Sequence, residues 1–293
     1  MIRVYISLTS IPSRVSRLLE SCVHGLMAQD YPNIQGIIVT VPRVNMRGQV
    51  FSEKETQALE AFSTNDAFKK KNVRVHRPEA DAGPMMKFLG AYPCIAADVG
   101  SGETCVFVCD DDQVYPPNYI SSYVSALEKL APADRKRTVL GCIGGAGLLC
   151  KIHPSFMTVM GVKGILLPSD AILRLYHKIK PIVVPTCCAM NDDVFVSLML
   201  HKLGYTFLSA PLCWMEFSNT EPDGLCKSYS GGFDKQKQQI QCHARFNTLI
   251  FSALVMCGCL ICVGVALCLA LAVTVAATPL LGPQRRPHTH TSK

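Results

Sequence analysis

Val106-Phe107-Val108-Cys109-Asp110-Asp111-Asp112 is the stretch of this sequence that decides the fold, and Gln113-Val114-Tyr115-Pro116-Pro117 follows it directly. A β-branched and aromatic run stopped by charge and proline is typical of a buried strand ending in a turn. Three adjacent carboxylates repel one another, so they favour a neutralising cation. Such oxygens suit Mg²⁺ or Mn²⁺, which often share their ligands with substrate phosphates. The stretch indicates a metal-dependent site for a phosphorylated donor; a solvated acidic turn is the alternative.

Strand-like and helix-like segments alternate on both sides of this stretch. The predicted strands are Val4–Leu8, Gly36–Val41, Val73–Val75 and Val106–Cys109. The predicted helices are Arg14–Ala28, Glu53–Lys70, Met85–Ala97 (broken or bent near Pro93) and Tyr119–Leu130. This alternation predicts an α/β domain with a mainly parallel sheet flanked by helices. Ligands of such sheets bind beyond the carboxyl ends of the strands, so Thr9-Ser10 and the acid triplet are expected to share one cleft.

The composition changes abruptly near residue 248. No charged residue occurs from Leu249 to Ala277, which exceeds the roughly 20 apolar residues that span a bilayer. We therefore expect a catalytic domain over 1–233, a linker over 234–248, a single transmembrane helix over 249–278 and a basic tail over 279–293. Since no secretory signal is recognisable at the N-terminus, this single-pass C-terminal anchor is expected to leave the large domain in the cytoplasm.

Charge and cysteine usage argue against two classes of function. The net charge is +7, but the basic residues are scattered and do not interleave with aromatic ones, so a nucleic-acid surface is not indicated. The 15 cysteines form no pair of CxxC motifs with zinc-site spacing. Free, partly buried thiols in a reducing compartment are the expected state.

A second acidic cluster, Asn191-Asp192-Asp193, opens a segment with helical apolar spacing that ends at Gly204. Acids in the first turn of a helix interact favourably with its dipole, and Asn or Asp caps well, so the cluster could be a simple N-cap. Its functional interpretation is a general base that accompanies a metal site formed by the triplet.

In this order the motifs resemble those of nucleotide-sugar glycosyltransferases with the GT-A fold, close to the family-two-like enzymes. The resemblance covers about residues 3–217. Its motifs are Ser7-Leu8-Thr9-Ser10-Ile11-Pro12-Ser13-Arg14, Gln29-Asp30-Tyr31-Pro32, Asp81-Ala82-Gly83-Pro84-Met85-Met86-Lys87, Asp110-Asp111-Asp112, Val159-Met160-Gly161-Val162-Lys163-Gly164 and Asn191-Asp192-Asp193-Val194-Phe195-Val196-Ser197.

The resemblance implies a Rossmann-like GT-A domain and a role for each candidate residue. Asp112, supported by Asp110, would bind Mn²⁺ or Mg²⁺ at the donor diphosphate. The expected donor-binding residues are Thr9, Ser10, Arg14, Lys87, Asp110 and Asp111. Asp193, with Asp192 as the second choice, would deprotonate the acceptor hydroxyl, which implies inversion at the anomeric carbon.

The implied activity is transfer of a hexosyl or deoxyhexosyl group from a nucleoside-diphosphate donor, with a UDP-sugar favoured. The acceptor would be a glycan or a lipid-linked hydroxyl at the bilayer, and no nucleic acid is expected as a partner. Two alternatives remain: a catalytically idle GT-A module that binds a nucleotide-sugar or glycan, and a metal-dependent nucleotidyltransferase. No metal or diphosphate ligand can be assigned in the loop over 219–232, and Trp214 either stacks on an acceptor sugar or packs in the core.

Overall fold

The computed structural model describes residues 1–44, 48–99, 103–144, 158–180, 191–212 and 242. The chain divides into two units, Met1–Arg245 and Phe246–Lys293, and the second lies outside the described residues. The predicted span over 249–278, the loop over 219–232 and Trp214 therefore also lie outside them. Within the described ranges, no helix combines the length and apolar character needed to cross a bilayer.

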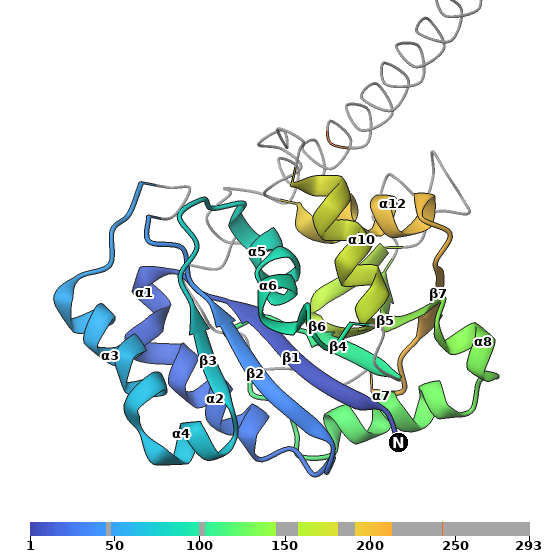
Figure 1. Cartoon of the computed structure of the whole chain (residues 1–293), viewed down its shortest axis with the longest axis horizontal. Helices are drawn as coiled ribbons and strands as arrows, with labels where there is room; N and C mark the ends of the chain where they lie inside the picture. The colour runs from blue at the N-terminus through green and yellow to red at the C-terminus, as the bar shows by residue number, and fades with distance from the viewer. Residues whose placement is uncertain (45–47, 100–102, 145–157, 181–190, 213–241, 243–293) are drawn as a thin grey trace, which may run out of the picture. The chain divides into compact units, whose positions relative to one another are not determined.

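A seven-stranded sheet forms the centre of the first unit (Figure 1), and its strands are ordered β3-β2-β1-β4-β6-β5-β7. The strands are β1 Arg3–Thr9, β2 Ile34–Thr40, β3 Val73–His76, β4 Thr104–Val108, β5 Thr138–Gly144, β6 Thr158–Pro168 and β7 Thr206–Ser209. The pairs β1–β2, β1–β4, β2–β3 and β5–β7 are parallel, whereas β6 runs antiparallel to both β4 and β5. The prediction of an α/β domain with a mainly parallel sheet is confirmed.

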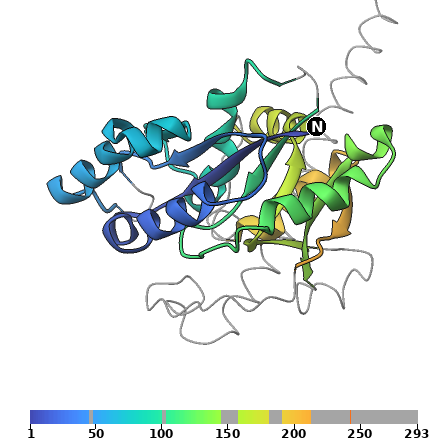
Figure 2. The ribbon, with the colours of Figure 1, turned by 90° about the horizontal axis from the view of Figure 1, so that it is seen from below.

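Helices cover both faces of this sheet, as the two ribbon views show (Figures 1 and 2). The first half contains α1 Pro12–Arg14, a π-helical turn Val15–Leu19, α2 Glu20–Met27, α3 Glu53–Thr64, α4 Asp66–Lys70, a 3₁₀ turn Gly83–Met85, α5 Met86–Leu89 and α6 Ala91–Ile95. The second half contains α7 Tyr119–Glu128, α8 Pro132–Arg135, α10 Ser169–Ile179 and α12 Asp192–Lys202. Helices α5, α6 and α10 lie on one face of the sheet, and α2 and α7 lie on the other (Figures 1 and 2).

Two predicted helices are interrupted, one at a local side-chain cap and the other at a contact with a neighbouring strand. The helix predicted over Glu53–Lys70 ends at Thr64 because Asn65 is extended, and its side chain accepts the amide of Ala67 to cap α4. The helix predicted over Met85–Ala97 breaks at Gly90 rather than near Pro93. A Cβ at Gly90 would lie 2.2 Å from the Thr40 hydroxyl oxygen, so this close approach to β2 requires glycine.

Strand β6 contains a large bulge. Gly141 pairs with Ile165, but the next residue of β5, Cys142, pairs with Met160, so residues 161–164 are left out of the ladder. Gly164 adopts a positive φ of 77°, and a Cβ there would lie 2.2 Å from the Phe107 ring. The bulge is therefore fixed against β4.

The cysteines depart in part from the expectation of free thiols. Cys22, Cys94, Cys105 and Cys109 are free. Cys142 and Cys242, both fully buried, are disulfide-bonded. Free thiols are thus correct for the first four residues and wrong for the last two.

Candidate functional site

The acid triplet follows β4 at the carboxyl edge of the parallel strands, beside the turn that follows β1. The Ser10 hydroxyl donates a short hydrogen bond to Oδ2 of Asp111, and the Arg14 guanidinium lies 2.7 Å from Oδ1 of the same carboxylate. Arg14 also lies 3.3 Å from Oδ2 of Asp112. The predicted meeting of the Thr9-Ser10 turn with the triplet is thus present, and Arg14 neutralises two of its three acids.

Asp111 is the buried member of the triplet, with 2% of its surface exposed. Burial raises its pKa to about 6, although Arg14 and Ser10 favour the charged form. The same acids hold the pKa of Arg14 above its usual range against the opposing effect of burial. Asp111 therefore anchors the turn through Ser10 and Arg14.

Asp110 points to a different cation. Its Oδ1 lies 2.7 Å from the Lys87 ammonium, and the same ammonium lies 2.7 Å from Oδ2 of Asp192. Lys87 comes from α5, Asp110 follows β4, and Asp192 begins α12. The two acidic clusters, about eighty residues apart in the sequence, therefore meet at one buried lysine.

Asp193 completes the cluster. Its Oδ1 accepts a 2.9 Å hydrogen bond from the backbone N–H of Gly161, in the bulge of β6. Burial, followed by the neighbouring charge of Asp192, raises the pKa of Asp193 to about 7. Asn191 makes no side-chain cap on α12, so the simple N-cap interpretation does not account for this cluster.

The Thr9 hydroxyl donates a 2.7 Å hydrogen bond to the carbonyl of Thr40 and so links β1 to β2. Sequence reasoning also missed two supports of the site. The Ser7 hydroxyl donates 2.6 Å to the Lys87 carbonyl, and the Gln29 amide donates 2.7 Å to the Pro116 carbonyl. Gln29 stood in a quoted motif, but nothing in its sequence context indicated this contact.

The donor set at the triplet is compatible with a divalent ion. Among the described residues, no three His, Cys, Asp or Glu side chains form a group that could enclose a metal. Mg²⁺ and Mn²⁺ sites of phosphate-transferring enzymes do not need one, because one or two carboxylates, water and substrate phosphates complete the shell. Asp110 and Asp112 could supply these carboxylates, and Asp110 is the more accessible, with 30% of its side chain exposed.

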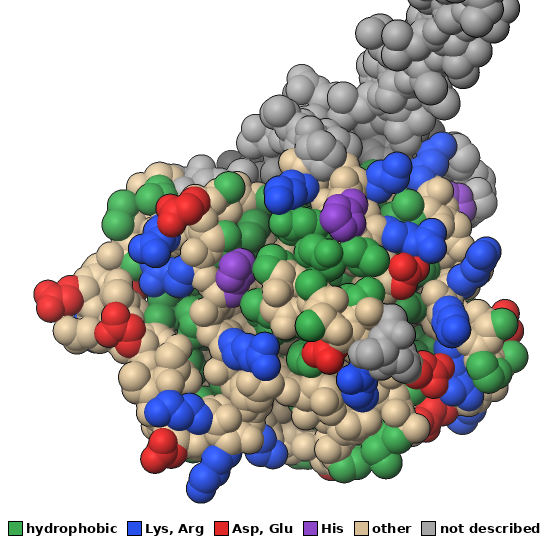
Figure 3. All heavy atoms as spheres, viewed as in Figure 1, with side chains coloured by type: hydrophobic (Ala, Val, Ile, Leu, Met, Phe, Trp, Pro, Cys, Tyr) green, Lys and Arg blue, Asp and Glu red, His purple; other side chains and the backbone are tan. Residues whose placement is uncertain are grey.

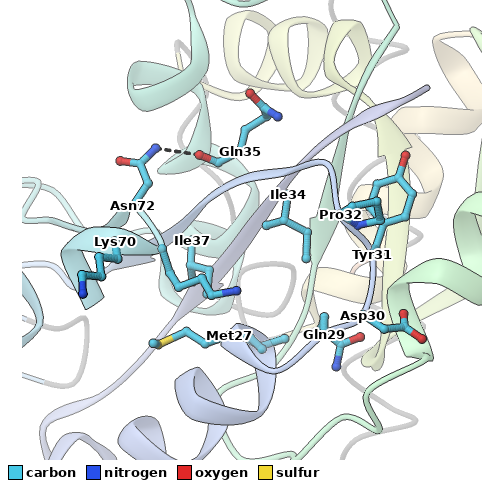
Figure 4. Close-up of a pocket in the computed structure, with 12 residues that line it drawn as sticks. Met27, Gln29, Asp30, Tyr31, Pro32, Ile34, Gln35, Ile37, Lys70 and Asn72 are labelled. Atoms are coloured by element: carbon cyan, nitrogen blue, oxygen red, sulfur yellow. Dashed lines mark hydrogen bonds between the residues drawn. The ribbon is translucent and has the colours of Figure 1, made fainter. Parts of the chain in front are cut away.

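A pocket of about 360 Å³ lies elsewhere, at the amino-terminal end of β2 (Figure 4). It is lined by Leu26, Met27, Gln29, Asp30, Tyr31, Pro32, Ile34, Gln35, Ile37, Lys70, Lys71 and Asn72. The Asn72 side chain donates 2.6 Å to the Gln35 carbonyl at its rim. None of the predicted site residues lines it, so it is separate from the acids.

Figure 3 shows one face of the molecule with its side chains coloured by type. Lys and Arg side chains there are spread among acidic, hydrophobic and neutral ones rather than gathered into a stripe.

No family model matches the sequence, and no curated protein matches it. Among solved structures, similar chains include a mannosyltransferase from Pyrobaculum calidifontis in complex with GDP-Man and Mn²⁺, at 14% identity and a TM-score of 0.47. That alignment covers 72% of this chain and 55% of the other, so this chain spans about half of the mannosyltransferase.

A glucosyl-3-phosphoglycerate synthase from Mycobacterium tuberculosis, in complex with Mn²⁺, UDP and phosphoglyceric acid, is similar at 12% identity and a TM-score of 0.43. The alignment covers 71% of this chain and 67% of the synthase. A mycobacterial protein gives 12% identity and a TM-score of 0.49 over 84% and 74%. Similarity at this level does not assign an activity, and function is inferred from the contacts within this chain.

Proposed function

We propose that this chain is a metal-dependent, inverting glycosyltransferase of the GT-A type, which moves a sugar from a nucleoside-diphosphate donor to an acceptor hydroxyl. The observation that carries the proposal is the convergence of Asp110 and Asp192 on Lys87. This convergence supports the proposal because it brings the acids proposed to face the donor phosphates close to Asp193, a carboxylate whose pKa suits general-base catalysis at neutral pH. A UDP-sugar is the favoured donor, and a glycan or lipid-linked hydroxyl is the favoured acceptor.

Asp193 would act on the acceptor. Oδ1 is held by the Gly161 amide, which orients the carboxylate toward a hydroxyl proton. As the acceptor oxygen forms its bond to the anomeric carbon, the bond to the diphosphate breaks and the proton passes to Asp193. Attack from the face opposite the leaving group inverts that carbon, and no covalent enzyme intermediate is required.

The triplet would act on the leaving group. Asp112 and Asp110 would hold Mn²⁺ or Mg²⁺, and a bound ion of this kind stabilises the charge that develops on a departing diphosphate. Arg14 keeps Asp111 and Asp112 in place and adds positive charge at the same edge. Ser10 fixes the other oxygen of Asp111.

A donor panel tests this proposal. The purified protein is incubated with UDP-, GDP- and dTDP-sugars and Mn²⁺, and slow hydrolysis is followed. We expect turnover of at least one donor, loss of turnover in Asp193→Asn with donor binding retained, and weakened donor binding in Asp112→Ala. No turnover of any donor, together with undiminished binding by Asp112→Ala, would contradict the proposal. A nucleotidyltransferase would instead release pyrophosphate from a nucleoside triphosphate.

The proposal includes the membrane anchor over 249–278, which would bring the site to a membrane-bound acceptor. Fractionation with and without that segment tests the anchor, and protease protection identifies the side on which the large domain lies. Cys142 is disulfide-bonded in the structure, so the proposed cytoplasmic placement requires that this bond is reduced in cells. Since disulfides persist mainly in oxidising compartments, a stably oxidised Cys142 would contradict it.

A further inference from the structure

Lys87 is a buried lysine with two acidic partners. Only 3% of its surface is exposed. Burial alone would lower its pKa, but the charges of Asp110 and Asp192 hold that pKa well above the usual range. A buried ammonium is stable only when it is paired and hydrogen-bonded. The hydrogen-bonded pair with Asp110 and the second ion pair with Asp192 satisfy this condition, and they leave almost no surface on which a phosphate of the donor could bind.

The backbone around Lys87 is fixed from the sheet. The Ser7 hydroxyl, in β1, donates to the Lys87 carbonyl, and Ser7 itself is fully buried. Helix α5 is only four residues long, so this contact holds the residue where the helix could not. Strand β1 therefore fixes the backbone position from which the Lys87 side chain reaches the acids.

Gly161 makes room for the ammonium. A Cβ on Gly161 would lie 2.5 Å from Nζ of Lys87 and 3.0 Å from Oδ1 of Asp193. The bulge that presents Gly161 is held in place, because the hydroxyls of Tyr119 and Tyr123 both donate to the Lys163 carbonyl, at 2.7 and 2.9 Å. Because Gly161 has no Cβ, it leaves the space that the Lys87 ammonium occupies.

We propose that Lys87, packed against Gly161, is a positioning residue. By pairing with both Asp110 and Asp192 it fixes the acid triplet relative to Asp193, the proposed general base. The expected effect on kcat rests on the proposed function, whereas the structural link between the two acidic clusters does not. This positioning role replaces the expectation that Lys87 binds donor phosphate.

A double-mutant cycle tests the structural link without any donor. Lys87→Met, Asp192→Asn and the double variant are unfolded in urea, with wild type as the fourth corner. We expect each single change to destabilise the protein and the pair to be non-additive by about tenfold in the unfolding constant. Additive effects would overturn the link even if the chain proves to be a glycosyltransferase.

The kinetic consequence separates positioning from phosphate binding. In Lys87→Met we expect kcat to fall by about a hundredfold, as misplacement of reacting groups does, while affinity for UDP at saturating Mn²⁺ changes less than about threefold. Loss of UDP affinity with kcat retained at saturation would overturn the proposal and restore Lys87 as a phosphate ligand.

Gly161→Ala is the second variant, because it keeps every charge while its added Cβ would lie 2.5 Å from Nζ of Lys87 and 3.0 Å from Oδ1 of Asp193. We expect it to fold and to reproduce the fall in kcat. Gly141→Ala, in β5, is the matched control. Its Cβ would lie 3.2 Å from Val159 and 3.6 Å from the Gly164 carbonyl oxygen, an ordinary contact, and neither Lys87 nor Asp193 is among its three nearest atoms, so we expect a wild-type rate. A wild-type rate in Gly161→Ala would show that the position of the Lys87 ammonium does not depend on the space left by Gly161. Should the wild type turn over no donor, the unfolding cycle still decides whether Lys87 links the clusters.

Discussion

The backbone N–H of Gly161 donates a 2.9 Å hydrogen bond to Oδ1 of Asp193, across the junction of β6 and α12. One oxygen of this buried carboxylate is therefore held by the main chain. That contact, rather than free rotation of the side chain, fixes the direction in which the remaining lone pairs of the carboxylate point. A carboxylate fixed in this way, with its pKa raised to about 7, has the properties that a general base requires.

Asp193→Asn should abolish transfer and stabilise the protein at alkaline pH. The folded-state pKa of about 7 lies above the unfolded value of about 3.9, so protonation favours the folded state. The cost of the buried charge grows as the pH rises from about 4 to about 7 and is fully present above that window. Asparagine removes it, and urea unfolding should show a gain of roughly 2 kcal/mol at pH 8 and little at pH 4.

Asp66→Asn is the control for this effect, because Asp66 is an exposed helix residue whose side chain is 89% accessible. Its stability should change little between the two pH values. A loss of stability at pH 8 in Asp193→Asn would mean that the carboxylate charge supports the fold, and would argue against its role as a strained base.

Arg14→Met should destabilise the protein because it leaves Asp111 charged and buried with Ser10 as its remaining partner among the contacts described above. Breaking a buried pair costs about 3–5 kcal/mol. Burial already raises the pKa of Asp111 to about 6, so protonation relieves this cost, and the loss measured by urea unfolding should be larger at pH 8 than at pH 5.

Asp111→Asn should rescue Arg14→Met, since it removes the charge that has lost its partner. Arg17→Met is the matched control: Arg17 lies in the adjacent turn, and its Nε bonds the Ser13 carbonyl at the surface. An equal loss of stability at both pH values would show that Arg14 acts through packing rather than through charge.

The first four strands, β1 to β4, were predictable because their apolar runs end at charge or proline, whereas β5, β6 and β7 were not predicted. The predicted strand Val106–Cys109 and the observed β4, Thr104–Val108, differ by two residues or fewer at each end. The breaks at Asn65 and Gly90 were not predicted. The first depends on a side-chain cap that spans two residues, from Ala67 to Asn65, and the second depends on a contact far away in the sequence. Gly90 packs on Thr40, fifty residues earlier, and helical periodicity carries no information about such a neighbour.

The two acidic clusters were predicted as partners, but the lysine between them was not. Lys87 was expected to face the donor, since a lysine in the sequence shows its charge and not its burial. Its position depends on the bulge over 161–164, which arises from the mismatch in register between β5 and β6. A register shift of this kind is a tertiary property and leaves no periodic signal.

Gln29→Met should weaken the hold on the loop that follows the triplet. The Gln29 amide donates to the Pro116 carbonyl at 2.7 Å, and its oxygen accepts the amide of Ile120 at 2.9 Å. Methionine fills the space but satisfies neither group. Urea unfolding should show a loss of about 1–3 kcal/mol, and Mn²⁺-dependent UDP binding should weaken.

Gln57→Met, on the exposed surface of α3, is the control and should change neither measurement. If Gln29→Met lost stability but bound UDP normally, the loop after Asp112 would not determine the geometry of the metal ligands.

Gly164→Ala should be far more damaging than Gly204→Ala, although both glycines have a positive φ, 77° and 82°. At Gly204 an added Cβ meets nothing within 4 Å, so the loss should be near the ~1 kcal/mol of a strained backbone. At Gly164 the same atom would lie 2.2 Å from the Phe107 ring, which is itself buried in β4. Relief of this clash requires the bulge to move, and we expect an additional loss of about 1–3 kcal/mol in the free energy of unfolding.

Because the bulge carries Gly161, kcat of Gly164→Ala should fall as well. Urea unfolding and donor turnover of the two variants decide the matter, and equal losses in both would show that β4 does not fix the bulge.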